Sequence, residues 1–149
     1  MSALLLAAAA LAAGCASKNE PPVLAATISA SAKVNPDSRK RPSPVVVRVY
    51  ELKSSAAFES ADFVSLSEKD QAVLGAEMLS REEMVMRPGD SKSINKNLAP
   101  GTKFIGITAA FRDLERARWQ AIVPVVNGKK NVVTISLDDI AIQAKRDKP

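Results

Sequence analysis

The chain has 149 residues, with 21 lysines and arginines against 16 acidic residues, which gives a formal net charge of +5. It contains no histidine and one cysteine, so it cannot form an intrachain disulfide, a zinc site of the usual Cys/His kind or a catalytic pair that needs histidine. Aromatic residues make up only 4% of the chain, which argues against a stacking surface for single-stranded nucleic acid. The length predicts one domain.

The chain opens with the uncharged apolar sequence MSALLLAAAALAAG, followed by Cys15. This stretch is too short to cross about 30 Å of hydrocarbon as a helix, but it is typical of a secretory signal peptide. The segment LAAGC resembles the bacterial lipobox, which predicts cleavage after Gly14 and acylation of Cys15. The alternative is an ordinary signal peptide followed by an incidental cysteine. We therefore expect a lipoprotein signal peptide over 1–14.

Residues 15–22 (CASKNEPP) are expected to form a lipid-anchored tether, because the segment is polar and ends in two prolines. A single acyl chain binds a membrane marginally, whereas two or three anchor a protein stably. Ala16 follows the cysteine, at the position where Asp is associated with retention in the inner membrane of enterobacteria. The resemblance to the lipobox therefore implies a location on the periplasmic face of the outer membrane.

Residues 23–144 are expected to form a single β-sandwich domain, which begins with a strand, a loop and a second strand. The small apolar residues of 23–32 predict the first strand, and the proline-containing polar segment 34–44 predicts the loop. Residues 45–52 (VVVRVYEL) give the strongest strand pattern in the chain, because three valines share one face. Valine, tyrosine and leucine make the opposite face partly apolar, which predicts that this face is covered at its ends.

The segment Ser54–Gly75 interrupts the strand pattern and predicts a helical insertion. Ser67 followed three residues later by Asp70 resembles a capping box, and Gly75 is typical of a residue that ends a helix. These signals predict a short helix over 68–74. The apolar residues expected to hold the insertion on the sheet are Phe58, Phe63 and Leu66.

Strand patterns resume after the insertion, in short segments separated by turns. Asn127-Gly128 is a strong hairpin signal, and a charged tail is expected over 145–149. Trp119 and the methionines are interpreted as core residues. Seven to eight short strands with a short helical insertion favour an all-β fold, a two-sheet β-sandwich, over a parallel α/β sheet. The further strands are expected at 78–86, 92–98, 103–112, 118–126, 131–137 and 140–142.

Acidic residues occur in adjacent pairs, Glu82-Glu83 and Asp138-Asp139. Neighbouring side chains in a strand point to opposite faces, so these pairs do not define a shared acid–base site. The sequence also contains no glycine-rich phosphate loop. We therefore expect a protein that is not an enzyme, has no small-molecule substrate, and carries no metal or cofactor apart from covalent lipid on Cys15. The alternatives left open are a hydrolase that uses a carboxylate pair, a periplasmic ligand-binding lipoprotein of the same sandwich class, and a pilotin or assembly chaperone.

Most cations of the chain are interleaved with acids, and we expect an exported protein to have no nucleic-acid partner. The exception is the loop between the first two strands, where three consecutive cations lie between prolines. Proline restricts the unbound chain and so lowers the entropic cost of binding, and clustered cations steer an acidic partner. The alternative is an ordinary solvated loop. The candidate partner-binding residues are Asn35, Pro36, Asp37, Ser38, Arg39, Lys40, Arg41, Pro42 and Ser43.

The chain resembles the TssJ family, the outer-membrane lipoproteins of the bacterial type VI secretion system, over nearly all of its length after the lipobox. Lys40 stands where many members of the family have glycine. The segments that carry the resemblance are, in order, NPDSRKRPSPVVVRVYEL from Asn35, AAFESADFVSL from Ala56, LGAEML from Leu74, MRPGDSKSI from Met86, FIGITAAFRDL from Phe104, and Trp119.

The resemblance implies a transthyretin-like two-sheet β-sandwich with added helical elements and a scaffold without enzymatic activity. It also implies a membrane core complex shared with two inner-membrane proteins, TssM and TssL, and a contact with the periplasmic C-terminal region of TssM. In the family, the loop between the first two strands is important for that contact, which corresponds to residues 35–43 here. Lipid on Cys15 would then link the outer membrane to the inner-membrane part of the machine.

Overall fold

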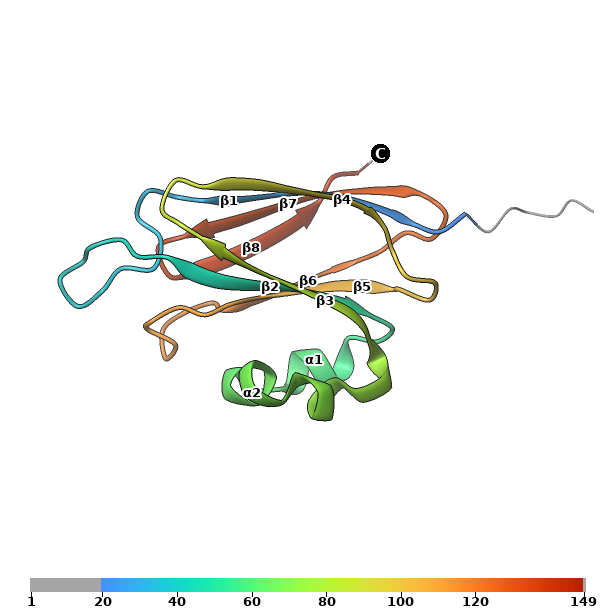
Figure 1. Ribbon diagram of the computed structural model, residues 1–149, viewed down its shortest axis with the longest axis horizontal. Coiled ribbons are helices and arrows are strands. Elements are labelled where there is room, and N and C mark those ends of the chain that lie inside the picture. The colour runs from blue at the N-terminus through green and yellow to red at the C-terminus, as the bar shows by residue number, and fades with distance from the viewer. Residues whose placement is uncertain (1–19, 149) are drawn as a thin grey trace, which may run out of the picture.

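The computed structural model describes residues 20–148, which form two four-stranded β-sheets packed face to face, with helices on the outer face of one sheet (Figure 1). Sheet A has the order β4-β1-β7-β8, in which β1 and β7 are parallel and the other pairs are antiparallel. Sheet B has the order β3-β2-β5-β6 and is antiparallel throughout. The strands of sheet A are β1 (Val23–Ala30), β4 (Ser91–Asn97), β7 (Lys130–Asp138) and β8 (Ala141–Arg146), and those of sheet B are β2 (Val45–Leu52), β3 (Met78–Met86), β5 (Phe104–Ala109) and β6 (Gln120–Pro124). The all-β two-sheet sandwich predicted from the sequence is confirmed.

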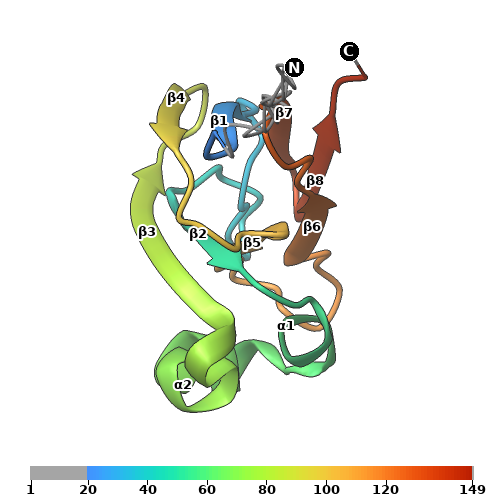
Figure 2. The ribbon, with the colours of Figure 1, turned by 90° about the vertical axis from the view of Figure 1, so that its right-hand side faces the viewer.

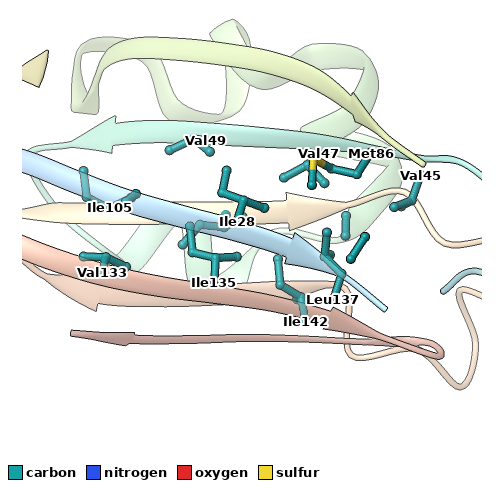
Figure 3. Close-up of a cluster of buried hydrophobic side chains, with 14 of the residues drawn as sticks. Ile28, Val45, Val47, Val49, Met86, Ile105, Val133, Ile135, Leu137 and Ile142 are labelled. Atoms are coloured by element: carbon teal, nitrogen blue, oxygen red, sulfur yellow. The ribbon is translucent and has the colours of Figure 1, made fainter. Parts of the chain in front are cut away.

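The core lies between the sheets and follows the alternation of each strand (Figure 3). In β7 every second residue from Asn131 to Leu137 is buried, and the intervening side chains are exposed. Such a pattern places one apolar face on the core and one polar face in water. The core side chains include Ile28, Val45, Val47, Val49, Ile105, Val133, Ile135, Leu137 and Ile142.

A second apolar layer lies between sheet B and the helices α1 (Ala56–Ser60) and α2 (Phe63–Leu74). Tyr50 and Leu52 point away from the main core and pack with Phe58, Leu66 and Leu74. The prediction that the second face of β2 is covered is therefore confirmed. Gly106 makes this packing possible, because a Cβ there would lie only 2.8 Å from the Phe58 ring.

The helical insertion differs from its sequence prediction. It contains two helices and a 3₁₀ turn, η1 (Gly75–Glu77), and α2 begins at Phe63 instead of residue 68. Asp62 caps α2, since its side chain accepts from the Ser65 N–H at 2.9 Å, and the helix is kinked at Lys69. Asp70 does not form the capping box with Ser67, because its buried carboxylate accepts from the Gln71 N–H at 2.8 Å and pairs with Arg81 at 2.5 Å.

The other boundaries also shift. The first strand ends at Ala30 instead of residue 32, and β8 continues to Arg146. Two residues assigned to a charged tail, Lys145 and Arg146, are therefore part of sheet A. The expected signal peptide over 1–14 and most of the tether, including Cys15, lie outside the described residues. Within 20–148, no helix combines the length and hydropathy needed to span a membrane.

The connections between the strands lie in two sets, at the two ends of the long axis of the sandwich (Figure 1). We call one end the N-terminal end, formed by the start of β1 with the β4–β5 and β6–β7 turns; it faces the viewer in Figure 2. The opposite end, called the loop end, carries the β1–β2 loop, the β3–β4 turn, the β5–β6 loop and the β7–β8 turn. The predicted binding residues 35–43 are thus at the end of the sandwich remote from Val23.

Candidate partner-binding site

The β1–β2 loop folds into a hairpin-like projection beyond the ends of its two strands (Figure 1). The Ser43 N–H donates to the Val34 carbonyl at 3.1 Å, and the Asp37 N–H donates to the Arg41 carbonyl at 2.9 Å. The turn at the tip closes through the Lys40 N–H, which donates to the Asp37 carbonyl at 2.9 Å. These backbone bonds give the loop a defined shape before any partner arrives.

Asp37 organises the tip of this loop. One carboxylate oxygen, Oδ1, accepts from the backbone N–H of Arg39 at 2.8 Å and of Arg41 at 2.9 Å. The other, Oδ2, accepts from the Arg41 side chain at 2.8 Å. The backbone and side-chain hydrogen bonds from Arg41 hold the pKa of Asp37 below its ordinary value. Asp37 is therefore a structural anion of the loop.

The three cations of the loop differ in whether they form an ion pair. Arg41 is committed to Asp37, whereas Arg39 and Lys40 are exposed and have no ion pair with any residue in 20–148. Lys40 adopts a φ of 60°, in the region that favours glycine, which turns the chain sharply at the tip. Two free cations thus project from a tight turn.

Asn35 fixes the base of the loop to two other connections of the loop end. It is 2% exposed, and its side-chain amide donates to the Pro44 carbonyl at 2.7 Å while its Oδ1 accepts from the Arg112 N–H at 2.8 Å. Its own N–H donates to the Asp139 carbonyl at 2.7 Å. Asn35 has a φ of 50°, a left-handed conformation that asparagine tolerates better than most residues. The β1–β2 loop, the β5–β6 loop and the β7–β8 turn therefore form one hydrogen-bonded unit.

Ser43 completes this base. Its hydroxyl donates to the Asn35 carbonyl and accepts from the Arg112 side chain at 3.0 Å. Both Asn35 and Ser43 are buried, so they shape the loop and cannot form its contact surface. The exposed part of the predicted segment is the run Ser38 to Pro42, with Pro36 and Asp37 partly exposed.

A groove of about 1080 Å³ separates the β1–β2 loop from the neighbouring connections. One wall is the loop itself, and the other contains Arg112 and Arg116 from the β5–β6 loop and Asp139 from the β7–β8 turn. Arg116 donates to Asp113 at 2.8 Å, and this hydrogen bond lowers the pKa of the Asp113 carboxyl. The sequence prediction missed this second wall. The arginine-rich segment FRDLERAR between two strands was the available signal.

Acidic side chains and a second cavity are the features that an enzyme, a ligand-binding protein or a metal site would use. Glu83 pairs with Arg48 at 2.7 Å, whereas Glu82 lies 4.0 Å from Lys96, so the two neighbours serve opposite faces of β3. A second cavity, between α2 and sheet B, encloses about 220 Å³, below the range of about 300–1,000 Å³ typical of small-molecule sites. Among residues 20–148, no group of three or more Cys, Asp or Glu side chains has the arrangement of a metal site.

The family model of type VI secretion lipoproteins (VasD, EvfM, TssJ, VC_A0113) matches residues 22–140. The chain belongs to this family. Three solved structures agree: the T6SS lipoprotein TssJ1 from Pseudomonas aeruginosa shares 30% identity with a TM-score of 0.83, covering 87% of this chain and 98% of its own. Serratia marcescens Lip, a membrane-bound component of the type VI secretion system, shares 22% identity with a TM-score of 0.77, covering 83% of this chain and 96% of its own. A chain in the structure of the T6SS protein TssM C-terminal domain from EAEC shares 23% identity with a TM-score of 0.66, covering 83% of this chain and 97% of its own. No curated protein sequence matches significantly.

Family membership confirms the resemblance found in the sequence. The geometry presents a preorganised cationic loop and groove at the end remote from the N-terminus, and these features carry the functional proposal.

Proposed function

We propose that this protein is a lipid-anchored adaptor of the type VI secretion membrane complex, which binds the periplasmic C-terminal region of TssM through its loop end. In this proposal Cys15 carries the lipid, the protein faces the periplasm from the outer membrane, and TssL belongs to the same complex. The observation that carries the proposal is the position of the rigid cationic loop 35–43, at the opposite end of the sandwich from the start of β1.

Separation of the two ends lets one molecule hold a membrane and a protein at once. The eight residues of β1 span about 26 Å between the N-terminal end and the base of the loop. A partner bound at the loop end is thereby kept away from the lipid. A chain with this fold occurs in the solved structure of the TssM C-terminal domain from EAEC, which supports TssM as that partner.

The loop end has the chemistry of a protein-binding surface. Lys40 and Arg41 on one wall of the groove face Arg112 and Arg116 on the other, and Asp139 adds an acceptor. Arg39 is exposed on the same loop. Arginine presents a planar fork of donors that matches carboxylates, so this surface favours an acidic segment of TssM. The loop is ordered by Asp37 and Asn35 in advance, which lowers the entropic cost of binding.

An adaptor between two membranes must also resist deformation, and the two sheets are joined by a partly buried ion pair. Glu51 of β2 is 3% exposed and accepts from Lys96 of β4 at 2.6 Å and from the Ala99 N–H at 2.7 Å. Burial opposes ionisation of Glu51, but the Lys96 and Ala99 hydrogen bonds outweigh it and lower the pKa of Glu51. We infer a scaffold without catalysis, because the carboxyls with shifted pKa, Glu51 among them, are held ionised by structural partners.

The test is binding of the periplasmic region of TssM to the Cys15→Ser protein. The double variant Arg39→Glu/Lys40→Glu reverses the two free cations and should weaken binding by at least about tenfold. Arg41 is left in place, because its reversal would also break the Asp37 network. The matched control is Lys129→Glu/Lys130→Glu, which makes the same charge change at the N-terminal end. Equal affinity of the two double variants would remove the loop from the proposal.

Anchoring has its own test. Wild-type protein should fractionate with the outer membrane, and Cys15→Ser should leave a soluble periplasmic form that still binds TssM. Membrane fractionation of the Cys15→Ser form identical to wild type would exclude Cys15 as the anchor.

A further inference from the structure

The N-terminal end carries three exposed lysines on two turns. Lys103 ends the β4–β5 turn, and Lys129 and Lys130 close the β6–β7 turn. None of the three has an ion pair with any residue that the structure describes, 20–148. The segments 98–103 and 124–130 contain no acidic residue, so their charge is not balanced locally.

Backbone hydrogen bonds bring these lysines to the point where the chain enters the sandwich. The Val23 N–H donates to the Lys129 carbonyl at 3.0 Å, and Val23 is paired with Lys130 in the register of β1 and β7. Lys103 joins them from sheet B, because its carbonyl accepts from the Val125 N–H at 2.8 Å. Val126, which lies beside these residues just before the Asn127-Gly128 turn, is 37% exposed.

The β6–β7 turn is rigid because a buried asparagine satisfies its backbone. Asn131 is 2% exposed and accepts from the Val126 N–H at 2.7 Å. Its side-chain amide donates to the carbonyls of Val126 and Lys129, both at 3.0 Å. Val126 and Lys129 are thus held in fixed positions next to Val23.

The length of the tether places this end close to the anchor. Val23 lies eight positions after Cys15, which limits their separation to about 26–29 Å even when the chain is fully extended. Two exposed acids, Glu20 before β1 and Asp147 after β8, are fewer than the three lysines, so positive charge remains in excess. An excess of cations held this close to a bilayer is attracted to anionic lipid, at about fivefold in affinity per lysine near the surface.

We propose that Lys103, Lys129, Lys130 and Val126 form a second membrane contact, in which the lysines bind the phosphate groups of anionic phospholipids and Val126 enters the interfacial region. The inference rests on the proposed lipid anchor at Cys15. Lysine is a compact charge on a flexible stem with rotatable donors, so it can follow a mobile headgroup. The contact orients the sandwich so that the loop end points away from the membrane.

The test uses the acylated protein in phosphatidylcholine vesicles with and without phosphatidylglycerol. Acylation blocks Cys15, so Val126→Cys supplies a single reactive thiol for an environment-sensitive fluorophore, and Ser38→Cys supplies the matched label at the loop end. Spin-labelled lipid should quench the label at 126 at least about twofold more in anionic than in neutral vesicles and should leave the label at 38 unaffected. Changing Lys103, Lys129 and Lys130 to Gln should abolish this difference, whereas changing Lys33, Arg39 and Lys40 to Gln removes the same charge and should preserve it.

Each other outcome overturns the proposal in a distinguishable way. Equal quenching at 126 in neutral and anionic vesicles means that the tether alone sets the distance. Disulfide-linked dimers of the unlabelled Val126→Cys protein identify a second copy of the chain as the occupant of this surface. Protein that does not float with the vesicles refutes the anchor itself, whereas protein that floats with its 126 label unquenched refutes only the second contact.

Discussion

The two ends of the sandwich are built with the same device and carry different kinds of positive charge. At each end a buried asparagine satisfies the backbone of a connection, Asn35 at the loop end and Asn131 at the N-terminal end. Around Asn35 the cations include arginines paired with Asp37 and Asp113, and around Asn131 they are lysines without ion pairs among residues 20–148. One rigid framework thus presents a directional surface at one end and a diffuse positive charge at the other.

The two asparagines also differ in how far along the sequence their hydrogen-bond partners lie. Asn131 bonds mainly within its own turn, to Val126 and Lys129, and touches one further strand through a long bond to the Val23 carbonyl at 3.4 Å. Asn35 connects residues far apart in sequence, because Arg112 lies in the β5–β6 loop and Asp139 in the β7–β8 turn. We therefore expect damage at Asn131 to remain local and damage at Asn35 to spread through the whole loop end.

The largest effect is expected for Asn35→Ala. The change leaves the Pro44 carbonyl and the Arg112 N–H without their partners in a partly buried site, and it puts alanine at a φ of 50°. Together these should lower the free energy of unfolding by about 3 kcal/mol and weaken the proposed TssM binding, since the loop loses its side-chain link to the β5–β6 loop. Urea denaturation and a binding titration measure the two effects. The control Asn35→Gly removes the same side-chain hydrogen bonds but accepts a φ of 50°, so it should lose less than Ala; equal losses for Gly and Ala would show that the left-handed backbone contributes nothing to the effect.

A smaller and separable effect is expected for Asn131→Ala. The β6–β7 turn loses its internal hydrogen bonds, which should lower the free energy of unfolding by about 2 kcal/mol. TssM affinity should stay within about twofold of wild type, because the loop end does not touch Asn131. The same two measurements apply. A loss of affinity comparable to that of Asn35→Ala would show that the two ends are coupled through the sheets. This result would contradict the claim that damage at Asn131 remains local.

The strands and the core were predictable because their signal is local. Alternation over Val45, Val47 and Val49 identified the buried face of β2, and the partly apolar opposite face correctly indicated a cover. The helical insertion was harder, since Ser67 and Asp70 match a capping box although Asp70 is used by Arg81. Local sequence cannot distinguish a capping carboxylate from one that pairs across the fold.

The candidate site was predictable only in its outline. The run of three cations between prolines was visible, but the burial of Asn35 and Ser43 depends on Arg112, which lies in a different connection. The cluster of lysines at the N-terminal end was also not predicted from the sequence. Lys103 and Lys129 are separated along the chain, and they come together only through the backbone hydrogen bonds of their turns and the pairing of β1 with β7. Contacts between distant connections have no sequence period, and this is why the second wall of the groove was missed.

The smallest expected effect concerns the side chain that accepts backbone hydrogen bonds at each end of the sandwich. At the loop end this acceptor is the carboxylate of Asp37, and at the N-terminal end it is the amide of Asn131. Because the pKa of Asp37 is lowered in the folded protein, the order that it imposes is complete above the ordinary value of 3.8 and is lost as pH falls through the lower folded value. The amide protons of Arg39 and Arg41, which donate to Asp37, should therefore shift in NMR spectra with a midpoint below 3.8. The Val126 amide donates to the side chain of Asn131, which does not titrate, and should stay constant over the same range. A midpoint at or above 3.8 for the two arginine amides would mean that Asp37 does not hold the tip in solution, and the loop would then have no advantage in entropy over an ordinary solvated one.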